Sequence, residues 1–332
     1  MNRPLIFLAL LVLPLASCSR AGTARPQLGL AMHSLDDADS AAIRKSLETQ
    51  ALDKVDLAII DGQNQQAAEN LQVDSLFRKG LGALAVDPVD GKALGDLIAK
   101  AKAGRVPVVF FDRKPSDEAM RSWDKLFFVS SSESDAGSAE GELLASYWKA
   151  APGADRNKDG VLQFLVLASG QARPGGLDFG QLVEGLEARL GGLGIKAERL
   201  GEDAELGSGA RALLAAYGSR VEALVCTDPA SAQQAIEALT SPVWAKLRKT
   251  LPVVSLGSGQ PSPTIAKLIK SGALLGAAYE DLESQGKAVF DLAYALARGR
   301  DPAKAGWHIV DAKYVWVPYV RYTNASPSIT AP

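Results

Sequence analysis

The feature that most constrains the fold of this chain is a regular alternation of short apolar runs with longer segments of helical periodicity. Runs such as 106–112 (VPVVFFD) indicate buried strands, and segments such as 181–192 (QLVEGLEARLGG) indicate amphipathic helices. Repeated strand–helix units imply parallel sheets with helices on both faces. Ligands of such sheets bind beyond the carboxyl ends of the strands, so residues that follow strands are the first candidates for a site.

The number of expected strands is too large for one sheet with short connections. The polar stretch 130–140 (SSSESDAGSAE) offers a place where the chain could cross from one sheet to another. We therefore predict an α/β fold of two Rossmann-like, doubly wound lobes. Strands are expected at 27–32, 55–61, 83–88, 106–112, 161–168, 196–202, 221–228, 251–257 and 274–281.

The first 18 residues, MNRPLIFLALLVLPLASC, have the build of an export signal. One Arg precedes an apolar run of about a dozen residues, shorter than the roughly 20 that span a bilayer. Small residues ending at Cys18 resemble a bacterial lipobox, in which the Cys becomes the lipid-modified first residue. An ordinary signal with a chance Cys is the alternative, but a chain with only two Cys favours the lipobox. We expect a signal at 1–17 and a tether at 18–26.

Composition excludes several classes of function. Removal of 17 residues from 332 leaves 315 and takes away Arg3, so the formal charge of −2 becomes −3. A near-neutral chain without basic runs gives no reason to expect nucleic acid. The chain has two His, far apart at 33 and 308, and no HExxH or CxxC motif, so we do not expect an enzyme. Cys226 lies in VEALVCTD and is expected to be a buried strand thiol.

Residues 155–163 read DRNKDGVLQ, with oxygen-bearing side chains at the first, third, fifth and ninth positions and Gly at the sixth. This is the first part of an EF-hand calcium loop. The twelfth position, which supplies a bidentate Glu in an EF-hand, is Val166, and the following residues read as a strand and a turn. The pattern leaves two interpretations, a calcium site with a distant last ligand or a polar turn capped by Asp and Asn.

Several segments, in their order along the chain, resemble the periplasmic galactose/glucose-binding proteins, which are type I periplasmic binding proteins that serve sugar ABC importers. The similarity runs from about Gln27 to about Tyr322. Parts of it are generic for the superfamily, but the calcium loop is not. The segments are 61–90, VPVVFFDRKPS (106–116), ADRNKDGVLQF (154–164), IKSGALLGAAYED (269–281) and YVWVPYV (314–320).

The resemblance implies two lobes joined by a three-segment hinge, with crossings near 131, 280 and 316. The N-terminal lobe would comprise 27–131 and 280–316, and the C-terminal lobe 132–279 and 317–328. It also implies a structural Ca²⁺ in the 155–163 loop, completed by a Glu just before a strand of the same lobe. The implied ligands are Asp155, Asn157, Asp159, Gln163, the backbone carbonyl of Val161, and Glu222.

The resemblance is weaker in the ligand cleft, where the family holds a sugar with carboxylates, amides, an Arg and two aromatic rings. Asp37 matches the acidic position of the family, but Asp39 stands where an aromatic ring is expected. Each carboxylate is alternatively a strand-end or helix-capping residue. The other positions carried over onto this chain are Asp112, Arg173, Asp228, Gln260 and Glu280.

Together these features predict a lipid-anchored, monomeric solute-binding protein of an ABC importer at the periplasm or cell surface. It would bind a glucose- or galactose-like monosaccharide between its lobes and present the closed form to a membrane permease. The alternative is a sensor or interaction lipoprotein, for example one that addresses a chemoreceptor, which has lost sugar binding or binds a different, cationic ligand. The concentration of acidic residues at the expected cleft is the basis of that alternative.

Overall fold

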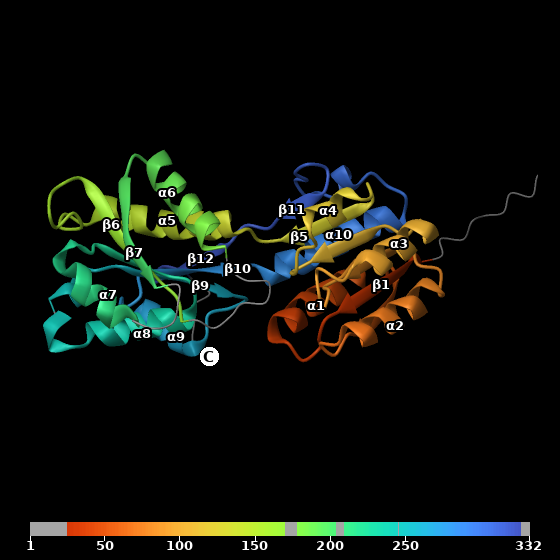
Figure 1. Cartoon of the computed structure of the whole chain (residues 1–332), viewed down its shortest axis with the longest axis horizontal. Helices are drawn as coiled ribbons and strands as arrows, with labels where there is room; N and C mark the ends of the chain where they lie inside the picture. Colours follow the sequence, from red (N-terminus) through yellow and green to blue (C-terminus); the bar gives the residue numbers. More distant parts are fainter. Residues whose placement is uncertain (1–24, 170–177, 204–208, 245, 327–332) are drawn as a thin grey trace, which may run out of the picture.

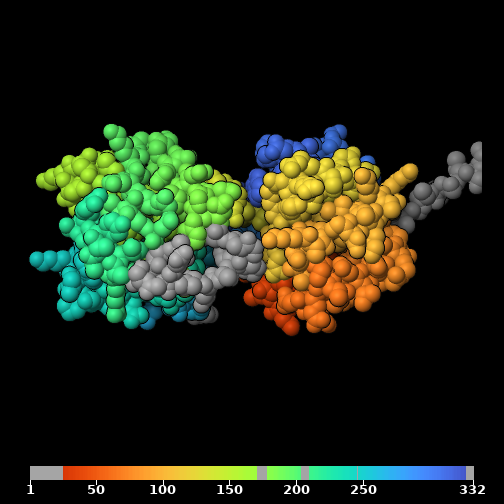
Figure 2. All heavy atoms as spheres, in the orientation of Figure 1, coloured from red at the N-terminus to blue at the C-terminus, as the bar shows by residue number. Residues whose placement is uncertain are grey.

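The computed structural model describes residues 25–169, 178–203, 209–244 and 246–326. They form two lobes that lie side by side along the long axis of the molecule, with a narrow waist between them (Figures 1 and 2). Each lobe contains one six-stranded sheet with helices on both faces. The predicted α/β fold with two doubly wound lobes is confirmed.

The N-terminal lobe is built on a fully parallel sheet of order β11-β5-β4-β3-β1-β2. Its strands are β1 (Gln27–Met32), β2 (Asp56–Asp61), β3 (Ala83–Val86), β4 (Val108–Phe111), β5 (Leu126–Ser130) and β11 (Tyr314–Trp316). Its helices are α1 (Ala38–Ala51), α2 (Gln66–Phe77), α3 (Gly95–Gly104), α4 (Asp117–Arg121), α10 (Leu282–Ala297) and the 3₁₀ turn η4 (Pro302–Lys304).

The C-terminal lobe repeats this plan with the order β12-β10-β9-β8-β6-β7, in which only β12 runs antiparallel to its neighbour. Its strands are β6 (Val161–Leu167), β7 (Lys196–Asp203), β8 (Ala223–Cys226), β9 (Val253–Ser258), β10 (Gly276–Glu280) and β12 (Val320–Thr323). Its helices are α5 (Glu133–Ala150), α6 (Phe179–Gly192), α7 (Gly209–Tyr217), α8 (Pro229–Leu239), α9 (Pro263–Lys270) and the 3₁₀ turns η1 (Gly218–Arg220), η2 (Pro242–Trp244) and η3 (Leu247–Lys249).

The sequence of β4 shows why both faces of each sheet are covered. Val109 and Phe111 point into the apolar core beneath α1 and α10, while Val108 and Phe110 point into a second core beneath α2 and α3. All four residues are completely buried. A strand buried on both faces requires a continuous apolar run rather than an alternating one, which is the pattern in the sequence.

The described chain passes between the two sheets in three places. It leaves β5 at Ser130 and enters α5 at Glu133, leaves β10 at Glu280 and enters α10 at Leu282, and leaves β11 at Trp316 and enters β12 at Val320. The crossing segments therefore follow the carboxyl ends of β5, β10 and β11. Residues at these ends lie beside the hinge.

The polar stretch 130–140 was expected to hold a crossover, and the first crossing does lie in it, but only in its first residues. Within this stretch only Ser131 and Ser132 connect the lobes, and Ser132 accepts a hydrogen bond from the backbone N–H of Asp135 at 3.1 Å as the N-cap of α5. The remaining residues form the first two turns of that helix. Small and polar residues continue into this helix because it packs closely on α6, where small side chains are needed.

Candidate functional site

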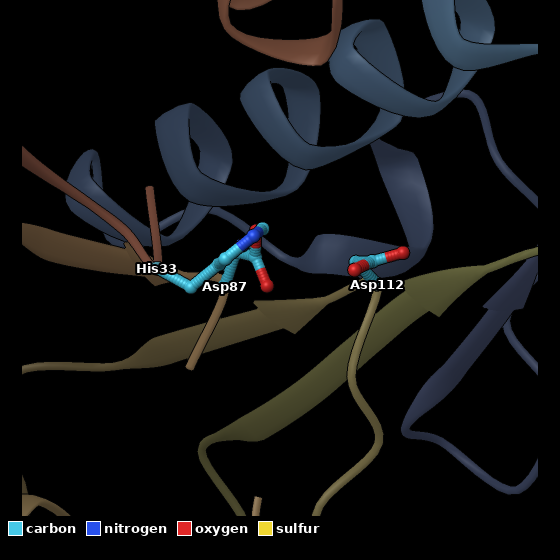
Figure 3. Close-up of side chains that lie close together, drawn as sticks. All are labelled: His33, Asp87 and Asp112. Atoms are coloured by element: carbon cyan, nitrogen blue, oxygen red, sulfur yellow. The ribbon is translucent and has the colours of Figure 1, made fainter. Parts of the chain in front are cut away.

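Polar residues follow three strands at the carboxyl edge of the N-terminal sheet. His33 follows β1, Asp87 follows β3, and Asp112 follows β4. One potential ligand atom from each side chain lies within 4.8 Å of the other two. Figure 3 shows Asp87 between the imidazole of His33 and the carboxylate of Asp112. The parallel sheet brings these residues together although they are spread over 80 positions of sequence.

The His33–Asp87 pair is buried, since the two residues are 4% and 0% exposed. Nδ1 of His33 and Oδ2 of Asp87 are 2.5 Å apart, and the hydroxyl of Ser40 lies 3.3 Å from each of these atoms. Oδ1 of Asp87 has no hydrogen-bond partner among the described residues. An orphaned carboxylate oxygen in a buried site is costly, so this atom is available to a ligand.

Asp112 has the most perturbed environment of the strand-end residues in this lobe. Burial, together with the negative charges of Asp87 and Glu280, raises the pKa of Asp112 to about 7, although Arg113 acts in the opposite direction. Its backbone adopts φ of 60°, a left-handed conformation that is uncommon for residues other than Gly. Within the described residues, the carboxylate makes neither a hydrogen bond nor an ion pair. These features are typical of a binding position.

Glu280 lies at the end of β10, where the second crossing begins. Its carboxylate accepts hydrogen bonds from the hydroxyls of Tyr319 at 3.0 Å and Ser258 at 3.2 Å. Tyr319 belongs to the third crossing and Ser258 to β9. The negative charge of Glu280 is also one of the causes that raise the pKa of Asp112, so the two residues are near enough to interact electrostatically.

Two of the proposed ligand residues are helix caps. Asp37 is the N-cap of α1 and accepts from the backbone N–H of Ser40 at 2.9 Å. Asp228 is the N-cap of α8, where it forms a capping box with Ser231 and also accepts from the backbone N–H of Ser169 at 3.0 Å. Asp228 is at a strand end, as expected, and Asp37 lies in the connection after β1, but their local hydrogen bonds are sufficient to explain the presence of both carboxylates.

The remaining candidates are dispersed. Asp39 is exposed on the first turn of α1, and a Cβ added to Gly259 of the other lobe would lie 4.0 Å from its Oδ1. Gln260 accepts a hydrogen bond from the hydroxyl of Tyr322 at 3.0 Å. It lines a cavity of about 650 Å³ beside the crossings, formed by α1, Asp281 and Tyr322 and not by the strand-end cluster of His33, Asp87 and Asp112. Arg173 and Cys18 lie outside the described residues.

The loop at 155–163 is a compact cluster of oxygen-bearing side chains. Asp155 accepts from the backbone N–H of Gly160 at 2.9 Å, and Asp159 accepts from that of Val161 at 2.8 Å. The amides of Asn157 and Gln163 donate to Oδ2 of Asp159 at 2.8 and 2.7 Å. Asp159 therefore contacts each of the other three residues whose side chains are implied ligands in the loop, since its own backbone N–H donates to Oδ1 of Asp155 at 3.2 Å.

Glu222 joins this loop from the start of β8. One of its carboxylate oxygens accepts from the backbone N–H of Arg156 at 2.6 Å, and the other from that of Gln163 at 3.3 Å. The residue is 2% exposed, and burial raises its pKa above the usual range. The donor set is rich in carboxylate and amide oxygens, which is the set that Ca²⁺ prefers. The residues present therefore fit the ion.

Sequence reasoning did not single out Asp87 or Glu69, a buried residue of α2. Glu69 accepts from Gln66 at 2.7 Å and from the backbone N–H of Val89 at 3.3 Å, so it fixes the loop that follows Asp87. Burial raises the pKa of Glu69. The signal for Asp87 was present in the sequence, because ALAVDP places a carboxylate directly after a strand, as VVFFD does.

Two further observations concern the free cysteine Cys226 and the search for a membrane-spanning helix. Cys226 is buried at the end of β8, as predicted. Among the described residues, the structure contains no helix that is both long enough and apolar enough to cross a membrane.

Comparison with known proteins gives a consistent picture. A family model described as a periplasmic binding protein domain matches residues 28–301. The D-galactose/methyl-galactoside binding periplasmic protein of Haemophilus influenzae is 31% identical over 316 residues, which is 92% of each chain. A putative rhizopine-binding protein of Rhizobium meliloti is 31% identical over 115 residues, 34% of this chain and 37% of the relative.

Solved structures with the same fold include two ABC transporter solute-binding proteins. One from Actinobacillus succinogenes, with bound D-allose, has a TM-score of 0.63 and 16% identity, and the match covers 90% of this chain and 98% of that one. One from Bacillus halodurans, with bound myo-inositol, has a TM-score of 0.59 and 17% identity, with 92% and 96% covered. At these identities the structures establish the fold alone.

Proposed function

Because the chain belongs to the periplasmic binding protein family, we propose that it is the solute-binding component of an ABC importer and binds a monosaccharide between its lobes. The observation that carries this proposal is the similarity to a galactoside-binding relative over 92% of both chains. The relatives of known role are binding proteins, and this chain is a binding protein rather than an enzyme.

The arrangement of strand ends supports a ligand between the lobes. Asp112 from one lobe and Glu280 from the hinge side of the other present carboxylate oxygens, which accept hydrogen bonds from sugar hydroxyls. A ligand that contacts both lobes binds the closed form better than the open form and shifts the population toward it. A membrane permease that recognises the closed pair of lobes would then receive loaded protein.

The test of this proposal is a titration of the mature chain, residues 19–332, which retains every described helix and strand. Glucose, galactose and ribose are added in the presence of Ca²⁺, and the melting temperature and heat of binding are recorded. A ligand at 100 times its Kd adds about 2.7 kcal/mol to the free energy of unfolding, which raises the melting temperature. A response to a hexose is expected. Failure of all hexoses, with a folded and calcium-responsive protein, would contradict the proposed ligand class.

We further propose that the 155–163 loop and Glu222 hold a structural Ca²⁺. When bound, the ion would join the α5–β6 connection to the start of β8, and it would take no part in chemistry. Chelation is expected to lower the melting temperature of the wild type. Glu222→Gln should abolish most of this response, while Glu118→Gln, at an exposed position on α4, should preserve it. An equal response to chelation in both variants would argue against the site.

The export signal and Cys18 support a lipid anchor, with the mature protein outside the cytoplasmic membrane. A single acyl chain gives only marginal membrane binding, so a stable anchor requires more than one chain. In cells, the full-length protein is expected in the membrane fraction, and Cys18→Ala is expected to release it into the soluble fraction. Equal partition of both forms would contradict the anchor.

A further inference from the structure

The cluster of His33, Asp87 and Asp112 has a composition that sugar recognition does not require. It combines one imidazole nitrogen with carboxylates from two neighbouring strands, and the three potential ligand atoms lie within 4.8 Å of one another. Mixed nitrogen and carboxylate ligands are typical of zinc and related divalent metals, whereas Ca²⁺ prefers oxygen alone. The cluster is also separate from the 155–163 loop, which belongs to the other lobe.

A second observation points independently to a ligand. Asp87 is 0% exposed, and its Oδ1 has no hydrogen-bond partner among the described residues. Native structures rarely leave such an oxygen unsatisfied without a water, ion or ligand to complete it. The carboxylate of Asp112 is likewise without a hydrogen bond or ion pair in the described part of the chain. Two carboxylates therefore lie close together, and the described residues do not supply enough hydrogen-bond donors for both of them.

The burial of His33 and Asp87 limits the kind of cation that can contact all three residues of the cluster. His33 and Asp87 are almost fully enclosed, while Asp112 is partly exposed. A single atom can contact all three. We propose that this cluster binds one divalent transition-metal ion of the zinc type at the floor of the cleft.

The geometry requires only small adjustments. Zinc–ligand distances of about 2.0–2.2 Å place neighbouring ligand atoms of a tetrahedral site about 3.4 Å apart. The three potential ligand atoms, which now lie within 4.8 Å of one another, would move to about this separation. The hydroxyl of Ser40, 3.3 Å from both His33 and Asp87, is placed to support the ligands from behind. A fourth position would face the cleft.

The experiment uses zinc alone as the probe and does not depend on any sugar. The mature chain is titrated with Zn²⁺ by calorimetry in the presence of saturating Ca²⁺, so that the 155–163 loop is not the acceptor. One equivalent of zinc is expected to bind. Because the chain contains only two His, the imidazole signals in an NMR spectrum report directly on the site. The His33 signal should shift on addition of zinc, and the His308 signal should not.

Variants test the assignment. His33→Ala and Asp112→Asn should each weaken zinc binding by about 100-fold or more, since each removes a direct ligand. His308→Ala is the matched control, because it removes the other imidazole of the chain at an exposed position. Asp112→Asn preserves side-chain shape at a partly exposed site and remains informative if His33→Ala fails to fold. Absence of zinc binding to the wild type, or wild-type affinity in Asp112→Asn, would overturn the proposal.

Discussion

Tyr319 and Glu280 join two of the three segments that connect the lobes. The hydroxyl of Tyr319 donates a hydrogen bond of 3.0 Å to Oε1 of Glu280, while the other oxygen of this carboxylate accepts from Ser258. Tyr319 lies between β11 and β12, and Glu280 ends β10. The pair therefore couples the position of the third crossing to that of the second.

Loss of this hydrogen bond should weaken the hinge. Tyr319→Phe is expected to lower the free energy of unfolding by about 1–2 kcal/mol, because a hydrogen bond to a charged group contributes more than one between neutral groups. Urea denaturation measures the change. Tyr294→Phe is the control, since Tyr294 stacks on Phe290 and its hydroxyl makes no hydrogen bond in the described part of the chain. Equal losses of unfolding free energy in Tyr319→Phe and Tyr294→Phe would contradict a specific contribution of the Tyr319 hydrogen bond.

The close contact of α5 with α6 depends on glycine. A Cβ added to Gly137 would lie 1.9 Å from the backbone oxygen of Leu182, and one added to Gly185 would lie 2.1 Å from that of Ser134. Gly137→Ala should therefore separate the helices and destabilise the protein by about 3 kcal/mol or more. Gly192→Ala on α6 meets no atom within 4 Å and should instead stabilise slightly, by up to about 1 kcal/mol. Thermal unfolding of the two variants should change in opposite directions.

Glu140 on α5 is completely buried, and neither carboxylate oxygen has a hydrogen-bond partner among the described residues. Burial raises its pKa well above the usual range. The folded protein then holds a proton that the unfolded chain releases, so stability is highest below the unfolded pKa and declines as pH rises toward the folded pKa.

Glu140→Gln removes this decline. The free energy of unfolding of this variant should exceed that of the wild type by a margin that grows above about pH 4.5, by up to about 1.4 kcal/mol per pH unit. Denaturation at a series of pH values measures it, with Glu118→Gln as an exposed control. A constant difference between Glu140→Gln and wild type across pH 5–8 would show that Glu140 does not titrate as described.

Arg105 ends α3 in the left-handed conformation, with φ of 54°. This conformation costs a residue with a side chain roughly 1–2 kcal/mol relative to Gly. Arg105→Gly should therefore stabilise the protein by about 0.5–1 kcal/mol. Arg78→Gly is the matched change at the end of α2, where φ is −64°, and it should have no benefit. Stabilisation of both or neither, measured by urea denaturation, would contradict the conformational argument.

The sequence by itself determined the fold class and predicted the oxygen-rich loop at 155–163. Strands such as 106–112 are continuous apolar runs because both faces of their sheet are covered, and this pattern can be read without coordinates. The loop could be predicted because its proposed ligands are adjacent in sequence, and Glu222 was reached only through the family resemblance. These are local patterns, in which residue type and spacing carry the information.

Only the tertiary structure decided what lies at the ligand cleft. Asp37 and Asp228 follow strands as ligand residues do, but their oxygens cap α1 and α8. Asp87, absent from the sequence-based candidates, converges with His33 and Asp112 because three strands end at one edge of a sheet. The same reason accounts for the extent of the crossover at 130–140, because the small residues that follow Ser132 serve the contact between α5 and α6. Sequence spacing does not record contacts between distant segments, and those contacts define the cluster proposed to bind a metal.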